Sequence, residues 1–227
     1  IAALACGGAL RHTLNHALFK STLFFAAGNV YQATHTLNVE HLGGLLKRLP
    51  MTGLFFLVAA VAICGLPPMN GFVSEIMIYL GLFDYLREAS VLSQVGAVAA
   101  ILALVMIGGL AILCFTKAFG VVFLGEERTQ LPEHKEFGAL RIVPLALLSL
   151  VMLSVGVYPE FYVSQLNGIM PLFGCPTIAL QGTVASIGRV SAVVIAVTAV
   201  LWLLRRLATK GKSIETGPTW GCGYTVP

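Results

Sequence analysis

The feature that most constrains this chain is a series of long apolar runs. Five stretches of the 227 residues are each apolar over about 20 residues, the length that a helix needs to cross a bilayer. Hydrophobic residues make up 57% and charged residues 11% of the chain, and its mean hydropathy is +0.88, whereas a soluble domain is roughly 25% charged. The runs are continuous rather than alternating, which favours helices. Because lipid cannot satisfy backbone hydrogen bonds, we predict an all-α, polytopic transmembrane helical bundle.

We predict about five spanning segments, at residues 1–29, 49–86, 94–124, 140–158 and 184–204. The second is too long for one straight helix, and it contains the sequence GLPPMNG. Four residues of this sequence cannot continue an α-helix without loss of backbone hydrogen bonds: Gly65, Pro67, Pro68 and Gly71. The second segment is therefore predicted to be a broken helix, with two halves joined by an unwound stretch. Residues 159–182 are weakly polar and are expected to lie along the surface or the membrane interface.

Lysine and arginine are distributed unevenly between the two sides of the predicted bundle. The connections after the second and fourth segments hold only Arg87. Those after the first, third and fifth hold nine cations: Lys47, Arg48, Arg128, Lys135, Arg141, Arg205, Arg206, Lys210 and Lys212. Cytoplasmic loops carry the excess of positive charge, so we expect the C-terminus in the cytoplasm. The chain begins without Met or a signal peptide, and we expect it to be a piece of a longer polypeptide.

Three basic residues interrupt the first apolar run. His12, His16 and Lys20 recur every four residues, which places them on one face of a helix at steps of about 6 Å. Ionisable groups are costly in lipid and normally face the bundle interior or water. Since histidine changes protonation near physiological pH and desolvated lysines exchange protons, one hypothesis is a proton relay. In the other, the segment lies at the interface and its cations extend to water. The pattern gives no account of Arg11.

Two further ionisable residues lie within predicted spans. Glu75 follows the helix break in the apolar sequence FVSEIMIYLGLF, and a broken helix frees backbone groups that can bind ions. Glu75 could load and release a proton at the end of a polar path, or pair with a cation from another segment for structural reasons. Lys117 lies near the inner end of the third segment, where a relay role and simple extension to the interface are equally open.

No cofactor site is expected on this chain. Its five cysteines occur singly and form no CxxC or other metal-binding spacing: Cys6, Cys64, Cys114, Cys175 and Cys222. We therefore expect them to be small buried hydrophobic residues. The sequence contains no Fe–S, haem, zinc or nucleotide motif. The net charge of +4 comes without a basic stripe interleaved with aromatic residues, so nucleic acid is not an expected partner.

Four stretches resemble the proton-antiporter-like membrane subunits shared by respiratory complex I, Mrp antiporters and energy-converting hydrogenases. These stretches are HTLNHALFKSTLFFAAGNV, HLGGLLKRLP, GLPPMNGFVSEIMIY and TKAFGVVFLG, all within residues 1–125. The ending TWGCGY resembles the hydrogenase-4 component B and formate hydrogenlyase subunit 3 branch. Residues 126–227 are otherwise similar only in hydropathy and are read as trailing transmembrane helices and a cytoplasmic tail.

The resemblance implies a fold and a function. Such subunits are similar to two inverted five-helix bundles, each with a broken helix, and the chain corresponds to the end of the second bundle. His12, His16 and Lys20 match the family's histidine and lysine positions, and Glu75 matches its ionisable position in the broken helix. The family's N-terminal bundle is absent from the sequence. The lateral cytoplasmic helix that ends some members is not evident.

The resemblance also implies a role. The expected function is proton translocation along His12, His16, Lys20, Glu75 and Lys117, driven by electron transfer in partner subunits. The expected partners are other membrane subunits, peripheral Fe–S and [NiFe] hydrogenase subunits, and lipid of a bacterial or archaeal plasma membrane. Two alternatives stay open: an Mrp-like cation/proton antiporter subunit, and a membrane scaffold that moves no protons. In each case this chain would itself catalyse no redox step.

Overall fold

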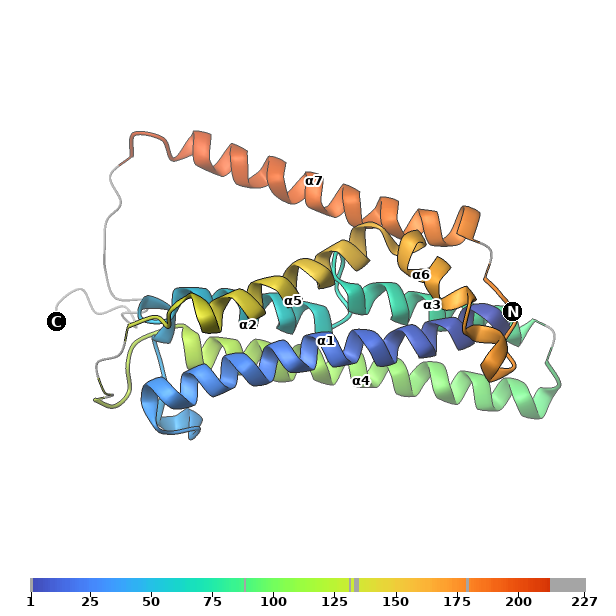
Figure 1. Ribbon diagram of the computed structural model, residues 1–227, viewed down its shortest axis with the longest axis horizontal. Coiled ribbons are helices and arrows are strands. Elements are labelled where there is room, and N and C mark those ends of the chain that lie inside the picture. Colours follow the sequence, from blue (N-terminus) through green and yellow to red (C-terminus); the bar gives the residue numbers. More distant parts are fainter. Residues whose placement is uncertain (1, 88, 131, 133–134, 179, 213–227) are drawn as a thin grey trace, which may run out of the picture.

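The computed structural model describes residues 2–87, 89–130, 132, 135–178 and 180–212, and these form helices and connections without strands. The main helices are α1 (Ala2–Thr34), α2 (Pro50–Ile63), α3 (Asn70–Leu86), α4 (Val91–Phe123), α5 (Ala139–Val157), α6 (Pro159–Asn167) and α7 (Ala185–Ala208). Short helical turns are η1 (Val39–His41), η2 (Leu45–Lys47), η3 (Met170–Phe173) and η4 (Leu180–Val184). The long helices run along one common direction (Figure 1), which confirms the all-α bundle.

Three helical stretches are long and apolar enough to cross a membrane: Val91–Phe123, Ala139–Val157 and Gly182–Ala208. These contain α4, α5 and α7 and match the third, fourth and fifth predicted segments. α1 has 33 residues, enough to cross, but its polar residues make it less apolar than these three. α2 and α3 are each shorter than a membrane-crossing helix and together make up the second predicted segment. The chain is therefore a multi-pass membrane protein.

The predicted helix break is confirmed. α2 ends at Ile63 and α3 begins at Asn70. Gly65 adopts the left-handed conformation, with φ +64°, which reverses the chain direction at low steric cost only for glycine. Gly71 and Gly156 bring backbones together at this point, since a Cβ on either would overlap a backbone carbonyl, that of Ala62 or of Pro68. The break is thus packed between α1 and α5 rather than loose.

α1 is the central helix of the bundle. It packs against α2, α3, α5 and α6. One buried apolar cluster joins three helices near the middle of α1: Phe19, Leu23, Ala59, Ala62 and Met152. A second cluster holds the C-terminal end of α1 against the 42–49 connection and the end of α4: Val30, Ala33, Leu42, Leu45, Leu49 and Phe123. These contacts fix the polar residues of α1 relative to the break.

The charged connection between α4 and α5 is bound to the connection between α1 and α2. Arg48 forms an ion pair with Glu127, with Nε and Oε1 2.6 Å apart. The guanidinium of Arg128 donates to the carbonyl oxygens of Val39 and Leu42. These bonds close one end of the bundle with polar chain.

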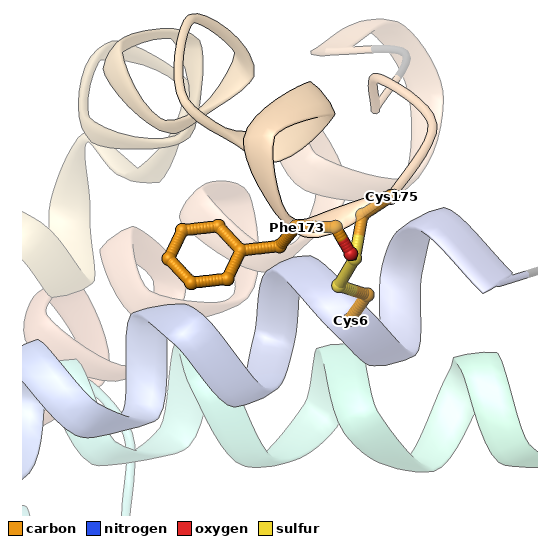
Figure 2. Close-up of a disulfide and its surroundings, with 3 residues drawn as sticks. All are labelled: Cys6, Phe173 and Cys175. Carbon is orange, nitrogen blue, oxygen red and sulfur yellow. A yellow bond between two sulfur atoms is a disulfide. The ribbon is translucent and has the colours of Figure 1, made fainter.

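The cysteine prediction is wrong for two residues. Cys6 of α1 and Cys175, between η3 and α7, form a disulfide across a sequence separation of 169 (Figure 2). Cys64 is buried, as expected, whereas Cys114 is exposed on α4. Cys222 and the TWGCGY sequence lie outside the described residues. Folding brings the two ends of the disulfide together, and single cysteines far apart in sequence carry no signal of such a pair.

Candidate functional site

The polar residues of α1 meet α3 where α3 begins. His12 Nδ1 lies 3.1 Å from Ser74 Oγ. Asn15 Nδ2 donates to the carbonyl oxygen of Asn70 over 2.7 Å and to Ser74 Oγ over 3.1 Å. Ser74 Oγ in turn donates to the carbonyl oxygen of Gly71 over 3.0 Å. Asn15, Asn70 and Ser74 are all fully buried, so the first basic residue of the row is held against the broken helix by a buried hydrogen-bond network.

The predicted basic row is present on α1, with each member in a different environment. The ring centroids of His12 and His16 are 6.3 Å apart, and both rings lie edge-on to Phe19. His12 and Lys20 are half-buried, whereas His16 is exposed. Lys20 makes no ion pair with any described residue. The row thus begins at the helix break and continues along a face of α1 that other described helices leave partly open.

Glu75 is the residue after Ser74 on α3, about 100° further around the helix. Its carboxylate lies against Gly65, where a Cβ would be 2.7 Å from Glu75 Cδ. Glu75 is half-buried and forms no ion pair with a described residue. The structure therefore brings Glu75 to the unwound stretch, and brings the basic row to Ser74 beside it, without direct contact between them.

Lys117 lies elsewhere. It is exposed on α4, and no described residue forms a hydrogen bond or ion pair with it. The structure does not bring Lys117 together with the other four candidates.

Arg11 is buried, with 6% of its surface exposed. Its guanidinium carbon lies 4.8 Å from the ring centroid of Tyr162 on α6, a cation–π contact that explains how a cation is held inside the bundle. The Tyr162 hydroxyl is 2.6 Å from Ser154 Oγ on α5. Arg11 therefore faces α5 and α6, away from the His12–Ser74 contact.

Sequence reasoning missed the neutral members of this site. Asn15, Asn70 and Ser74 are the residues that join α1 to the break, and polar residues within apolar spans were the available signal. Among the described residues, no three side chains of His, Cys, Asp or Glu lie together as a metal-binding group would require. The arrangement offers imidazole, amine, carboxyl and amide groups, whose chemistry is proton and ion transfer.

Known proteins share this arrangement of sequence. Residues 1–103 match the family described as NADH:quinone oxidoreductase/Mrp antiporter, TM. The chain is 31% identical to hydrogenase-4 component B of Escherichia coli (strain K12) over 96% of its length and 34% of the relative's. It is also 31% identical to formate hydrogenlyase subunit 3 of the same strain, over 98% of its length and 36% of the relative's.

The fold is likewise shared with a solved structure. The membrane-bound sulfane sulfur reductase, an archaeal respiratory membrane complex, contains a chain that matches 96% of this one with a TM-score of 0.68 and 23% identity, and 35% of that chain is covered. The present chain thus spans about a third of the length of these relatives. With the basic row, the broken helix and the sequence matches in agreement, the chain belongs to the NADH:quinone oxidoreductase/Mrp antiporter family of membrane subunits and is related to the hydrogenase-4 and formate hydrogenlyase subunits.

Proposed function

We propose that this chain is part of a proton-translocating membrane subunit in an energy-converting hydrogenase or formate hydrogenlyase-type complex. Protons would move along His12, His16, Lys20 and Glu75, driven by electron transfer in partner subunits. The observation that carries the proposal is the hydrogen bond between His12 and Ser74, which connects the basic row of α1 to the helix break beside Glu75.

The break suits a carboxylate that changes charge. An unwound stretch exposes backbone dipoles to an ion inside the membrane, and Gly65 leaves room for the Glu75 side chain beside it. Moving one proton against 100 mV costs about 2.3 kcal/mol, which exergonic electron transfer in a partner would supply. A change of charge at one member of the row acts on its neighbours at short range, because the surroundings have a low dielectric constant.

Two features support a cytoplasmic C-terminus in a bacterial or archaeal plasma membrane. The cationic connections lie at the end of the bundle where α1 finishes, and the Cys6–Cys175 disulfide lies at the opposite end, where α1 starts (Figure 1). Positive loops favour the cytoplasm, and disulfides form on the oxidising side of the membrane. A membrane-impermeant maleimide should label Cys175 in intact cells after mild reduction. Labelling only in inverted vesicles would reverse the orientation.

The proposed partners follow from the relatives. Hydrogenase-4 and formate hydrogenlyase are names of multi-subunit enzymes, so other membrane subunits, peripheral Fe–S subunits and a [NiFe] subunit would accompany this chain. The redox cofactors would belong to those partners, and none is proposed here.

The family description also names Mrp antiporters, which supports a second candidate, a cation/proton antiporter subunit. Purification under mild detergent separates the two, because a hydrogenase-type subunit should bring iron–sulfur and nickel-containing partners with it. A scaffold that moves no protons is the third candidate.

Lys20→Ala and Glu75→Gln test the proposal in the assembled complex in vesicles. Each should abolish proton translocation while artificial-acceptor electron transfer continues. Asp84→Asn, an acid-to-amide change near the far end of α3, and Lys47→Ala, on an exposed turn, are the matched controls and should translocate normally. If Lys20→Ala and Glu75→Gln both leave coupled translocation intact, the scaffold reading replaces the proposal. Lys117→Ala assigns that residue to the relay only if it also loses translocation.

A further inference from the structure

α1 carries a second polar row, distinct from the basic one. Asn15, Thr22 and Asn29 are spaced by seven residues, which places them on one face about 10.5 Å apart along the axis. Their exposed fractions are 0%, 0% and 6%, so this row faces the interior, whereas His16 is exposed. Burial of polar side chains is costly without partners, so each end and the middle of the row call for an explanation.

One end of the row reaches a carboxylate near the surface. Asn29 Nδ2 donates to Thr52 Oγ1 over 3.2 Å, and Thr52 Oγ1 donates to Glu136 Oε1 over 2.9 Å. Glu136 Oε2 also accepts from the backbone N–H groups of Met51 and Thr52, over 2.7 and 3.0 Å. Glu136 is half-buried in the connection before α5 and holds a negative charge at the start of α2. The row therefore opens at the end of the bundle that bears the cationic connections.

The other end of the row reaches the helix break. Asn15 Nδ2 donates to the Asn70 carbonyl oxygen, and Asn70 Nδ2 donates to the Asn15 carbonyl oxygen over 3.4 Å. These bonds fix both amide orientations, because a flipped amide would set oxygen against oxygen. Both Oδ1 atoms are then buried without a partner. Two neighbouring acceptors that lack donors fit a bound water molecule, which has two O–H groups to donate.

The middle of the row has a further unpartnered group. Ser149 of α5 is 7% exposed, and its Oγ is buried without a hydrogen bond. Its neighbours on α5, Leu145 and Met152, pack into clusters with Ala26 and Phe19 of α1 respectively. Ser149 therefore faces α1 between these two levels, which is the level of Thr22.

We propose that this row binds a file of water molecules that carries protons from the Glu136 end to His12. The inference rests on the proposed function and adds its cytoplasmic uptake path. A hydronium ion at the mouth gives one proton to the first water, each water passes one proton onward, and Ser74 delivers one to the imidazole of His12. No electron moves, and one proton leaves bulk water for each that His12 gains. Glu136 stays ionised and attracts cations to the mouth.

The test removes hydroxyl groups from the file without removing structure. Ser149→Ala deletes a group that has no hydrogen bond to lose, and Thr22→Val keeps the shape of the side chain. In the assembled complex, the double variant should slow proton translocation on the order of tenfold, equivalent to about 1.4 kcal/mol added to the barrier. The slowed step should also show a larger rate decrease in D₂O. Thr22→Ser, which keeps the hydroxyl, should restore the wild-type rate.

Thr198→Val is the matched control. Thr198 has the same hydrogen bond to the preceding helical turn as Thr22, but it is exposed on α7, so its variant should behave as wild type. Wild-type translocation and an unchanged D₂O effect in the double variant would overturn the water file. If Lys20→Ala and Glu75→Gln still abolish translocation, that result would leave the proposed function standing. Normal translocation in all four variants would remove both.

Discussion

Replacement of Gly65 by alanine tests the geometry of the helix break. Gly65 has φ +64°, a conformation that costs an alanine residue about 1–2 kcal/mol. The new Cβ would also lie 2.7 Å from Cδ and 2.9 Å from Oε1 of Glu75. Because these atoms end a flexible side chain, the carboxylate moves away instead of the backbone. The variant should therefore lose little stability and displace the acid.

The expected loss of about 1–2 kcal/mol corresponds to a decrease of roughly 2–8 °C in Tm for a chain of this size. Thermal unfolding of the purified complex in detergent, followed by tryptophan fluorescence, measures it. Proton translocation in vesicles should fall as far as it does in Glu75→Gln. Combining Gly65→Ala with Glu75→Ala removes the collision, so the added loss of Tm should then be that of the backbone alone.

Gly96→Ala in α4 is the control for Gly65→Ala, because no atom lies within 4 Å of the added Cβ and its φ is not positive. It should keep both the Tm and the translocation rate. A Gly65→Ala complex with the wild-type Tm and full translocation would refute the left-handed turn and the position of the Glu75 carboxylate beside it.

Other substitutions test the packing around the site. Gly156→Ala should lower the Tm strongly, because its Cβ would overlap a backbone carbonyl of the break that has little freedom to move; an unchanged Tm would contradict that close contact. Met152→Ala, in a fully buried position, should cost about 2–5 kcal/mol, whereas Met106→Ala, 66% exposed on α4, should stay within about 0.5 kcal/mol; equal losses would argue against the core described here. Cys175→Ser should lower the free energy of unfolding by about 2–4 kcal/mol, and reduction of the wild type should do the same; identical gel mobility with and without reductant would exclude the Cys6–Cys175 bond.

Local signals in the sequence predicted the spans and the break. Apolar runs of sufficient length, and the prolines and glycines of residues 65–71, act through nearby backbone, so α4, α5, α7 and the α2–α3 break matched their predictions. The four-residue spacing likewise placed His12 and His16 next to each other on α1.

Contacts between distant segments could not be predicted in the same way. The Cys6–Cys175 disulfide depends on how the chain between α6 and α7 returns to the start of α1. The burial of Arg11 depends on Tyr162 of α6, and the role of Glu136 depends on where the connection before α5 meets α2. None of these pairs shares a spacing or a motif, because each is set by helix packing. The division of the chain at residue 125 stays a prediction.

The central claim is that Glu75 takes up and releases a proton during turnover. Infrared difference spectroscopy of the assembled complex, recorded between resting and electron-transferring states, observes this directly. The account predicts a carboxylic acid C=O band that shifts in D₂O, disappears in Glu75→Gln and persists in Asp84→Asn. A spectrum in which Glu75→Gln leaves every carboxyl band unchanged would contradict it.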